Sequence, residues 1–233
     1  MPVTALASMC QMEDICLERN EILVVLAKRQ LAERMALQLL DEAEVTRYHA
    51  YVFEADKQRH LLAHGLKRQV LARLTGQAPE SLQFRAGPAG KPYLPDQKVQ
   101  FNISHSGDWV ALAFSTTHVV GVDVEQARDL DYDDLLTQIA HPADALTIFN
   151  TNSKSSEQRF LASWSMKEAV AKCAGKGLSM HFPSLRLTAD EHGRHVCISQ
   201  EDSWHVRHQM LGSTHLAVAS SSANWHLRLL ELE

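Results

Sequence analysis

The stretch VQFNISHSGDWVALAFSTTHVVGVDVE, residues 99–125, decides the fold because it joins three strand-like segments through short polar turns. Residues 99–103 and 109–115 are rich in β-branched and aromatic side chains, and residues 105–108 between them are typical of a hairpin turn. Residues 119–125 alternate apolar with small or acidic side chains, which is the pattern of a strand with one buried face. The sequence therefore predicts a run of adjacent strands in the middle of the chain.

Helical patterns flank this central run of strands. Apolar residues recur at helical spacing from residue 30 to about 51, over 55–74 and over 157–174. Further strands are predicted at residues 21–27, 185–187, 195–198, 205–210 and 215–220, and loops at 87–95 and 151–156. Helices followed by runs of strands with short turns favour the α+β class over a doubly wound parallel sheet.

The composition excludes several classes of protein. Of the 233 residues, 45% are hydrophobic and 22% are charged, a balance typical of a folded chain. The formal net charge of −5 argues against a dedicated nucleic-acid-binding protein. Apolar runs are far shorter than the roughly 20 residues that span a bilayer, and no secretory signal is visible, so we expect no membrane association. Four scattered cysteines favour a cytoplasmic location.

Two acidic side chains share one face of the strand predicted at residues 119–125. Alternate residues of a strand point the same way, so Asp123 and Glu125 lie together while Val122 and Val124 point into the core. Neighbouring carboxylates repel each other unless a cation lies between them, and hard oxygen ligands favour Mg²⁺ or Mn²⁺ over zinc. The pattern is short, however, and an ordinary half-exposed acidic strand would look the same.

A second group of candidate residues lies on the helix predicted at 157–174. Trp164, Glu168 and Lys172 are four residues apart and therefore line one side of it. A Glu and a Lys at this spacing usually form a surface salt bridge. The functional alternative makes Glu168 a third metal ligand and Lys172 a partner for phosphate.

The hairpin turn and the preceding loop also carry candidate residues. Ser104 and His105 are adjacent, so their side chains diverge in an extended chain and a Ser-His-Asp hydrolase is not expected. A turn that presents hydroxyl, amide and imidazole groups to a phosphate is one interpretation, and a hairpin turn with polar caps is the other. Lys91 and Arg47, in a predicted loop and a predicted helix, would by themselves be solvated.

Taken together, the motifs GKPY (90–93), FNISHS (101–106), GVDVE (121–125) and WSMKEAVAK (164–172) resemble those of one family in order and spacing. That family is the surfactin-type 4′-phosphopantetheinyl transferases, and the resemblance covers residues 45–180. It implies two similar α/β subdomains related by a pseudo-twofold, with coenzyme A in the cleft between them. We divide the chain accordingly into a loosely attached N-terminal extension (1–20), an N-terminal subdomain (21–117) and a C-terminal subdomain (118–233).

The resemblance also implies a reaction and a set of site residues. The reaction is Mg²⁺-dependent transfer of phosphopantetheine from coenzyme A to a serine of an apo acyl or peptidyl carrier protein, which releases adenosine 3′,5′-bisphosphate. By the motif match the metal ligands would be Asp123, Glu125 and Glu168, and the coenzyme A contacts Lys91, Ser104, His105, Lys172 and Arg47. Glu168 and Lys172 would also be catalytic, with Glu168 as the base, directly or through a metal-bound water. Glu44 stands where some members have a second lysine for coenzyme A.

Two alternative functions remain open from the residues. A Mg²⁺-dependent hydrolase of coenzyme A or of a nucleotide pyrophosphate would need the same carboxylates but no surface for a carrier protein. A catalytically dead binding module is disfavoured by the intact acidic trio. For the carrier we expect docking at residues 172–180, with Lys176, Leu178 and Met180, and we expect a monomer because two subdomains supply both walls of a cleft.

Overall fold

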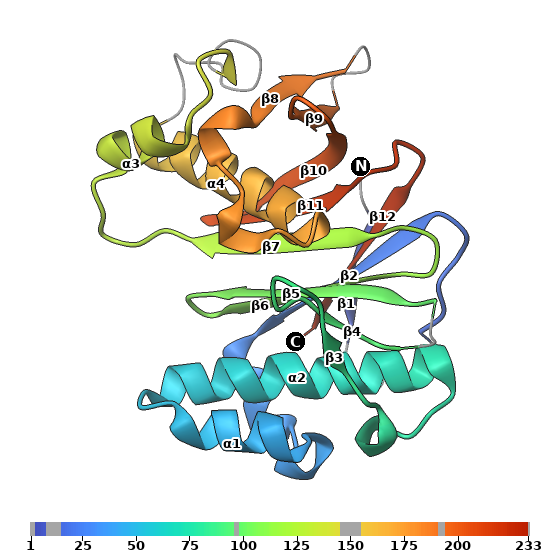
Figure 1. The fold of residues 1–233 in the computed structure, drawn as a ribbon. Helices are drawn as coiled ribbons and strands as arrows, with labels where there is room; N and C mark the ends of the chain where they lie inside the picture. Colours follow the sequence, from blue (N-terminus) through green and yellow to red (C-terminus); the bar gives the residue numbers. More distant parts are fainter. Residues whose placement is uncertain (1–2, 8–14, 96–97, 145–154, 191–193, 233) are drawn as a thin grey trace.

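The computed structural model describes residues 3–7, 15–95, 98–144, 155–190 and 194–232, and it contains two five-stranded sheets flanked by helices (Figure 1). The first sheet has the order β1 (Val3–Ala7), β12 (His226–Leu232), β2 (Glu21–Lys28), β6 (Trp109–Ser115), β5 (Gln100–Ser106). The second has the order β7 (Val120–Gln126), β11 (Thr214–Ser220), β10 (Ser203–Leu211), β9 (His195–Ile198), β8 (Arg186–Ala189). A small ladder joins β3 (Arg85–Ala86) to β4 (Pro92–Tyr93).

The two sheets pack face to face and each carries helices on its outer side, which makes four layers (Figure 1). Helices α1 (Glu42–Ala50) and α2 (Glu54–Thr75) lie beside the first sheet, and α3 (Tyr132–Ile139) and α4 (Ser156–Cys173) beside the second. Short 3₁₀ turns occupy Arg29–Arg34, Leu37–Leu39, Pro79–Ser81, Gly177–Ser179 and Phe182–Ser184. Because the structure mixes helices with largely antiparallel sheets, the α+β class is confirmed.

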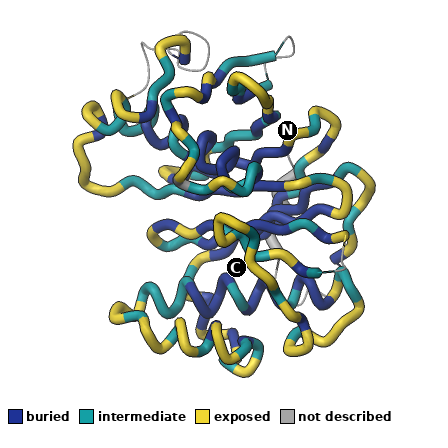
Figure 2. Tube along the Cα trace, viewed as in Figure 1, coloured by how far each residue is buried: buried dark blue, intermediate teal, exposed yellow. Residues whose placement is uncertain are grey.

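Strand β2 shows why the sequence folds in this way. Leu23 and Val25 point to the core under α2, whereas Ile22 and Val24 point to the core between the sheets. A strand buried on both faces has an unbroken apolar sequence, which residues 22–27 have. Strands β2, β6, β7 and β11 are accordingly almost entirely buried, whereas the outer surfaces of the helices are exposed (Figure 2).

Several predicted elements are confirmed with small changes in their ends. They are the helices at 55–74 and 157–174 and the strands at 21–27, 99–103, 109–115, 119–125, 185–187, 195–198, 205–210 and 215–220. The loop predicted at 87–95 contains the two-residue strand β4, and of the loop predicted at 151–156 only Ser155 and Ser156, at the start of α4, belong to the described residues.

The helix predicted from residue 30 to about 51 is wrong in its first half. This region forms two 3₁₀ turns, and the chain is extended at Met35, Ala36 and Leu40. The helix begins anew at Glu42 because Asp41 and Glu44 form a capping box, in which each side chain accepts from the backbone N–H of the other residue.

The hairpin turn is shorter than predicted. Strand β5 continues to Ser106, so Ser104 and His105 lie on a strand and not in a turn. Only Gly107 and Asp108 make the turn, and Gly107 has a positive φ of 55°, which glycine adopts readily. The interpretation of residues 104–106 as a phosphate-binding turn is therefore wrong in its geometry.

Both ends of the chain contribute strands that the sequence did not predict. Residues 3–7, predicted as part of a loose extension, form β1, and the unpredicted strand β12 lies between β1 and β2 in parallel register. The first sheet therefore contains strands from before residue 20 and from after residue 118. The division of the chain into an extension and two subdomains stays a prediction. Helix α3 was also not predicted. None of the described helices is long and apolar enough to span a bilayer.

Candidate functional site

The candidate site lies where the edges of the two sheets meet. Strand β5 ends the first sheet and β7 ends the second, and side chains from alternate positions of β5 reach the backbone of β7. We call this set of contacts the seam. Its three bonds run from the backbone N–H of Val122 to Asn102 Oδ1 (2.9 Å), of Val124 to Ser104 Oγ (3.3 Å) and of Gln126 to Ser106 Oγ (3.3 Å).

The same serines also donate to the two carboxylates of β7. Ser104 Oγ donates to Asp123 Oδ1 at 2.8 Å, and Ser106 Oγ donates to Glu125 Oε2 at 2.7 Å. The other oxygen of Glu125 accepts from Trp164 Nε1 of α4 at 2.9 Å. Asp123 and Glu125 therefore face α4 together, as the alternation of the strand predicts.

Helix α4 approaches β7 closely at Gly121. A Cβ added there would lie 1.9 Å from the carbonyl oxygen of Ala169 and 2.4 Å from the backbone nitrogen of Cys173, so a larger residue would force helix and strand apart. This close packing places Lys172 over the strand. Its Nζ donates to Asp123 Oδ1 at 2.6 Å and to Ser104 Oγ at 2.9 Å. The Glu-to-Lys spacing on α4 therefore does not make a simple surface salt bridge.

Two carboxylates of the site are buried without full hydrogen bonding. Asp123 and Glu168 are only 2% and 7% exposed, and among the described residues Asp123 Oδ2 and Glu168 Oε1 have no hydrogen-bond partner. Burial raises the pKa of Asp123 to about 7, even though Lys172 opposes this, and the charge of Glu125 adds to the rise. Burial likewise raises the pKa of Glu168, against Lys172 and with Glu125. An approaching cation would relieve the cost of these buried charges.

The donor set suits a hard cation, although the described side chains do not form a ready-made cage. Carboxylate oxygens are the ligands that Mg²⁺ and Mn²⁺ prefer, and the two buried unpartnered oxygens provide free coordination capacity. Within the described ranges, however, no group of three or more His, Cys, Asp or Glu side chains is close enough to hold a metal ion. Here Asp123 pairs with Lys172, and Glu125 is held by Ser106 and Trp164.

Lys91 lies beside this cluster, and its ammonium group is not solvated as a loop lysine usually is. Its Nζ donates to the carbonyl oxygens of Val120 (2.8 Å) and Lys172 (2.9 Å), which links β7 to the end of α4. Burial lowers the pKa of Lys91. It lines one cavity of about 360 Å³ together with Phe101 and Gly175.

A second cavity adjoins the seam. It has a volume of about 180 Å³ and is lined by Lys91, Lys172, Asn102, Ala89 and the glycines Gly90, Gly175 and Gly177. Two lysines and one amide side chain around a small space suit an anionic ligand.

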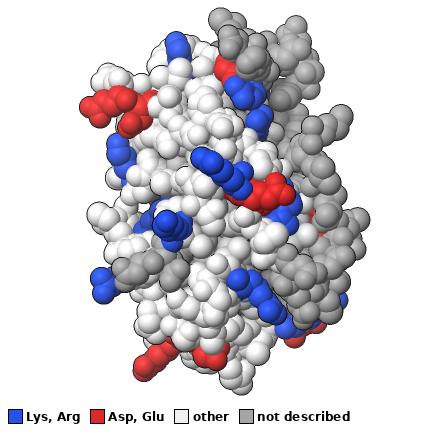
Figure 3. Space-filling model, turned by 90° about the vertical axis from the view of Figure 1, so that its right-hand side faces the viewer, with Lys and Arg blue, Asp and Glu red and all other residues white. Residues whose placement is uncertain are grey.

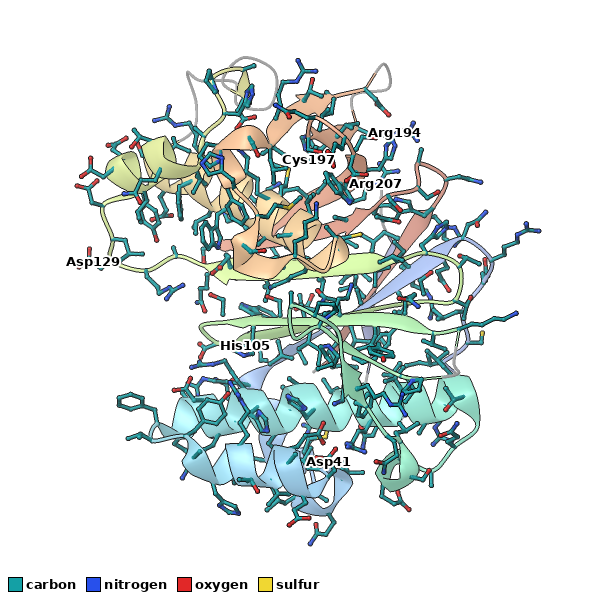
Figure 4. The ribbon with its side chains drawn as sticks, viewed as in Figure 1. Asp41, His105, Asp129, Arg194, Cys197 and Arg207 are labelled. Atoms are coloured by element: carbon teal, nitrogen blue, oxygen red, sulfur yellow. The ribbon has the colours of Figure 1, made fainter. Side chains whose placement is uncertain are left out.

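His105 and Arg47 stand apart from the carboxylates. His105 lies on β5 near the turn of the β5–β6 hairpin (Figure 4), and as the next residue along the strand its side chain is on the opposite face from that of Ser104. Burial lowers the pKa of His105, and the charges of Arg59 and Lys172 lower it further. Arg47 donates to the hydroxyl of Tyr51 at 3.3 Å on α1, and no described contact joins it to the seam. Of the predicted residues, the structure thus gathers Ser104, Asp123, Glu125, Glu168, Lys172 and Lys91.

The sequence reasoning missed the roles of Asn102 and Ser106 and gave Trp164 none. The alternation N-x-S-x-S over residues 102–106 is a signal for one polar face of a strand, and it could have indicated a contact with a neighbouring strand.

Comparison with known proteins agrees with the motifs. The model of the 4′-phosphopantetheinyl transferase N-terminal domain matches residues 29–117, and that of the 4′-phosphopantetheinyl transferase superfamily matches residues 119–222. The transferase gsp of Aneurinibacillus migulanus is 34% identical over 60% of this chain and 58% of its own length. A 4′-phosphopantetheinyl transferase of Bacillus subtilis is 31% identical over 65% of this chain and 67% of its own length. The transferase Sfp of Bacillus subtilis strain 168 is 30% identical over 66% and 67%.

The aligned region spans less than two thirds of the length of gsp. The two family models together cover every strand of the second sheet and, of the first sheet, β6 and β5. The resemblance inferred from the four motifs is confirmed: this chain belongs to the 4′-phosphopantetheinyl transferase superfamily and, within it, to the surfactin-type members.

Proposed function

We propose that this chain transfers the 4′-phosphopantetheine group of coenzyme A to a serine hydroxyl of an apo carrier protein. The observation that carries the proposal is the pair of buried, unpartnered carboxylate oxygens on Asp123 and Glu168 beside the ammonium group of Lys172. Such a site concentrates groups that bind a cation and an anion at one place. The names of the relatives support the same reaction.

Asp123, Glu125 and Glu168 would hold the divalent cation, Mg²⁺ or alternatively Mn²⁺. The raised pKa values of Asp123 and Glu168, and the unpartnered oxygen that each keeps among the described residues, support this role. When bound, the cation would withdraw negative charge from the pyrophosphate of coenzyme A and stabilise the departing adenosine 3′,5′-bisphosphate.

Lys172 would supply a fixed positive charge to the pyrophosphate. Its Nζ is anchored by Asp123 and Ser104, and it lines the small cavity next to the seam. A cation that is already oriented stabilises charge developing in the transition state without further rearrangement. Lys91, whose Nζ donates to two backbone carbonyls, would contact coenzyme A from the cavity that it lines. Ser104, His105 and Arg47 would also contact coenzyme A.

Glu168 would act as the base. A serine hydroxyl is a weak nucleophile at neutral pH, so a base must take its proton, and a buried carboxylate with an oxygen that has no partner among the described residues can accept it. The serine proton passes to Glu168 Oε1, the serine oxygen bonds to the phosphorus that carries pantetheine, and the bond to the bisphosphate oxygen breaks. Ordering of these groups in one site lowers the entropic cost of the step.

We also propose that the chain consists of two similar subdomains related by a pseudo-twofold. Each sheet has five strands and a long helix on its outer face, which supports a pseudo-twofold relation between the halves. The cleft for coenzyme A would follow the seam, where both cavities lie.

The carrier protein would dock beside the end of α4. Lys176 and Met180 line a third cavity, of about 330 Å³, with His181 and Ser184. The side chain of Leu178 lies outside the described residues. Lys176 is exposed and would meet acidic groups of the carrier. On the face shown in Figure 3 the Lys and Arg side chains are spread over the surface with uncharged areas between them. We propose that the chain acts as a monomer.

The test is incubation of the chain with coenzyme A, Mg²⁺ and a panel of apo carrier proteins, followed by intact mass measurement. We expect the mass of at least one carrier to rise by one phosphopantetheine group, with release of the bisphosphate. Cleavage of coenzyme A without a modified carrier would support the hydrolase instead. No chemistry with any carrier would contradict the proposal.

A further inference from the structure

Ser104 and Ser106 repeat the same pair of contacts along the seam. Each hydroxyl accepts from a backbone N–H of β7 and donates to the carboxylate of the preceding residue. The repeat follows because both strands have a period of two, so every second side chain of β5 meets every second backbone N–H of β7. Asn102 continues the row opposite Gly121, a residue without a carboxylate.

Each carboxylate oxygen of Glu125 accepts a hydrogen bond from a neighbouring side chain. Ser106 donates to Oε2 at 2.7 Å and Trp164 donates to Oε1 at 2.9 Å. A more distant guanidinium, that of the exposed Arg128, lies 3.6 Å from Oε2. The two short contacts come from the first sheet and from α4, although Glu125 itself belongs to the second sheet.

Both donors are themselves held in place. Ser106 is buried, and its oxygen also accepts from the N–H of Gln126. The indole of Trp164 packs against Phe160 at 5.7 Å and Phe182 at 5.3 Å between ring centroids. Each carboxylate oxygen can accept two hydrogen bonds or ligands, so one donor on each oxygen leaves capacity for a cation.

We propose that Ser106 and Trp164 are positioning residues, which orient the carboxylate of Glu125 for the divalent cation. This rests on the proposed function, because it takes Glu125 as a metal ligand. Donors to a ligating carboxylate typically change metal affinity by about 10- to 100-fold. The site would then be complete only when both sheets and α4 are assembled.

The experiment measures Mn²⁺ binding to the coenzyme A-bound chain by electron paramagnetic resonance, with Ser106→Ala and Trp164→Phe. We expect about 10- to 100-fold weaker Mn²⁺ binding in each variant. Coenzyme A binding in the presence of EDTA should stay within about twofold, since neither side chain contributes to the lysine-lined cavity. Ser106→Thr keeps a hydroxyl and should restore most of the Mn²⁺ affinity.

Ser115→Ala is the matched control, because Ser115 is a buried serine of the same sheet whose hydroxyl donates to the Glu21 carbonyl and not to the site. It should leave Mn²⁺ binding unchanged. Trp164→Phe keeps the ring stack, so it tests the lost N–H even where Ser106→Ala does not fold. Unchanged Mn²⁺ affinity in a folded Ser106→Ala or Trp164→Phe would overturn the positioning role alone. No Mn²⁺ binding by the unaltered chain would overturn the proposed metal site and, with it, the positioning role.

Discussion

Glu44 and Asp123 are both buried carboxylic acids, but the surrounding protein shifts their pKa values in opposite directions. Glu44 is 8% exposed and accepts hydrogen bonds from Lys67, from Arg68 Nε at 2.7 Å and from His64 Nδ1 at 2.8 Å. Burial would raise the pKa of Glu44, but the hydrogen bonds from His64 and Lys67 and the charge of Lys67 outweigh it and hold the pKa well below its usual range. For Asp123 burial prevails, and the pKa rises to about 7.

The difference lies in the supply of donors. The Glu44 cluster belongs to the helical layer near Asp41 (Figure 4) and ties α1 to α2, with every charge partnered. At the seam, Asp123 Oδ2 and Glu168 Oε1 are buried without a partner among the described residues. A buried acid with a full set of donors stabilises the fold, whereas one that lacks them retains the capacity to bind a cation or a proton.

Adjacent residues of α4 show the same contrast. Lys167 is fully buried, and its Nζ donates to Asp144 Oδ2 at 2.7 Å and to the carbonyl of Ile139 at 2.8 Å. It therefore fixes α4 against the segment after α3. Glu168, the next residue, points to the seam and keeps a free oxygen. One motif thus contains a structural residue and a site residue side by side.

The largest expected effect is that of Glu168→Gln on transfer. The amide cannot accept the serine proton and is a poorer cation ligand, so the rate of carrier modification should fall by about 10²- to 10⁴-fold. Because the substitution removes a buried, partly unpartnered charge, the melting temperature should not fall. Intact mass against time measures the rate, and a near-unaltered rate would show that Glu168 is neither base nor ligand.

Glu44→Gln should have the opposite effect to Glu168→Gln: it should lower stability and leave activity nearly unchanged. It leaves Lys67 buried without a carboxylate and Arg68 with that of Asp41 alone, and such a loss typically costs about 3–5 kcal/mol of unfolding free energy. Urea unfolding measures the loss, and the specific activity of the folded fraction should be nearly unchanged. A stable variant that has lost its activity would place Glu44 in the site and contradict its structural role.

Asp123→Asn should change how the free energy of unfolding depends on pH, because it removes the group with the raised pKa. The folded chain keeps the Asp123 proton up to about pH 7, whereas the ordinary value is 3.8, so the unfolded chain binds fewer protons between these values. The contribution of Asp123 to stability is therefore present at low pH and is lost as the pH rises through this window, by at most about 1.4 kcal/mol per pH unit. Urea unfolding in EDTA at pH 4.5 and 7.5 should show the variant gaining stability relative to the unaltered chain at the higher pH. Equal differences at both pH values would contradict the raised pKa.

Lys176→Glu should have the smallest effect, confined to the carrier. Reversal of one exposed charge at a docking surface typically weakens an encounter by only a few-fold, about 1 kcal/mol or less. The KM for the carrier should rise while the KM for coenzyme A stays constant. Arg73→Glu, an exposed reversal at the end of α2, is the matched control. An equal effect of both variants would indicate a general charge effect and not docking at Lys176.

Much of the fold could be predicted because its elements have strong local periodicity. Residues 55–74 and 157–174 carry helical patterns, and residues 109–115 and 119–125 carry those of strands. The 30–51 region could not be predicted in this way, since extended residues at Ala36 and Leu40 and a capping box at Asp41 interrupt the apolar spacing. Strand β12 depends on pairing with β2, about 200 residues earlier, which local patterns do not indicate.

The candidate site divides in the same way. Asp123, Glu125, Glu168 and Lys172 could be chosen from short motifs, because strand and helix periods place them on common faces. The contacts of Ser106 and Lys91 depend on which edges meet in three dimensions, and no spacing within one motif contains that information. Nor do the local patterns indicate that the pKa values of Glu44 and Asp123 shift in opposite directions, since the donors around Glu44 come from other segments.

The most direct measurement is a crystal structure of the chain with coenzyme A and Mn²⁺, in which the anomalous signal locates the ion. We expect one Mn²⁺ ion bound by oxygens of Asp123, Glu125 and Glu168, next to the pyrophosphate and Lys172. An ion bound elsewhere, or one that contacts none of these carboxylates, would contradict the assignment of the seam as the active site.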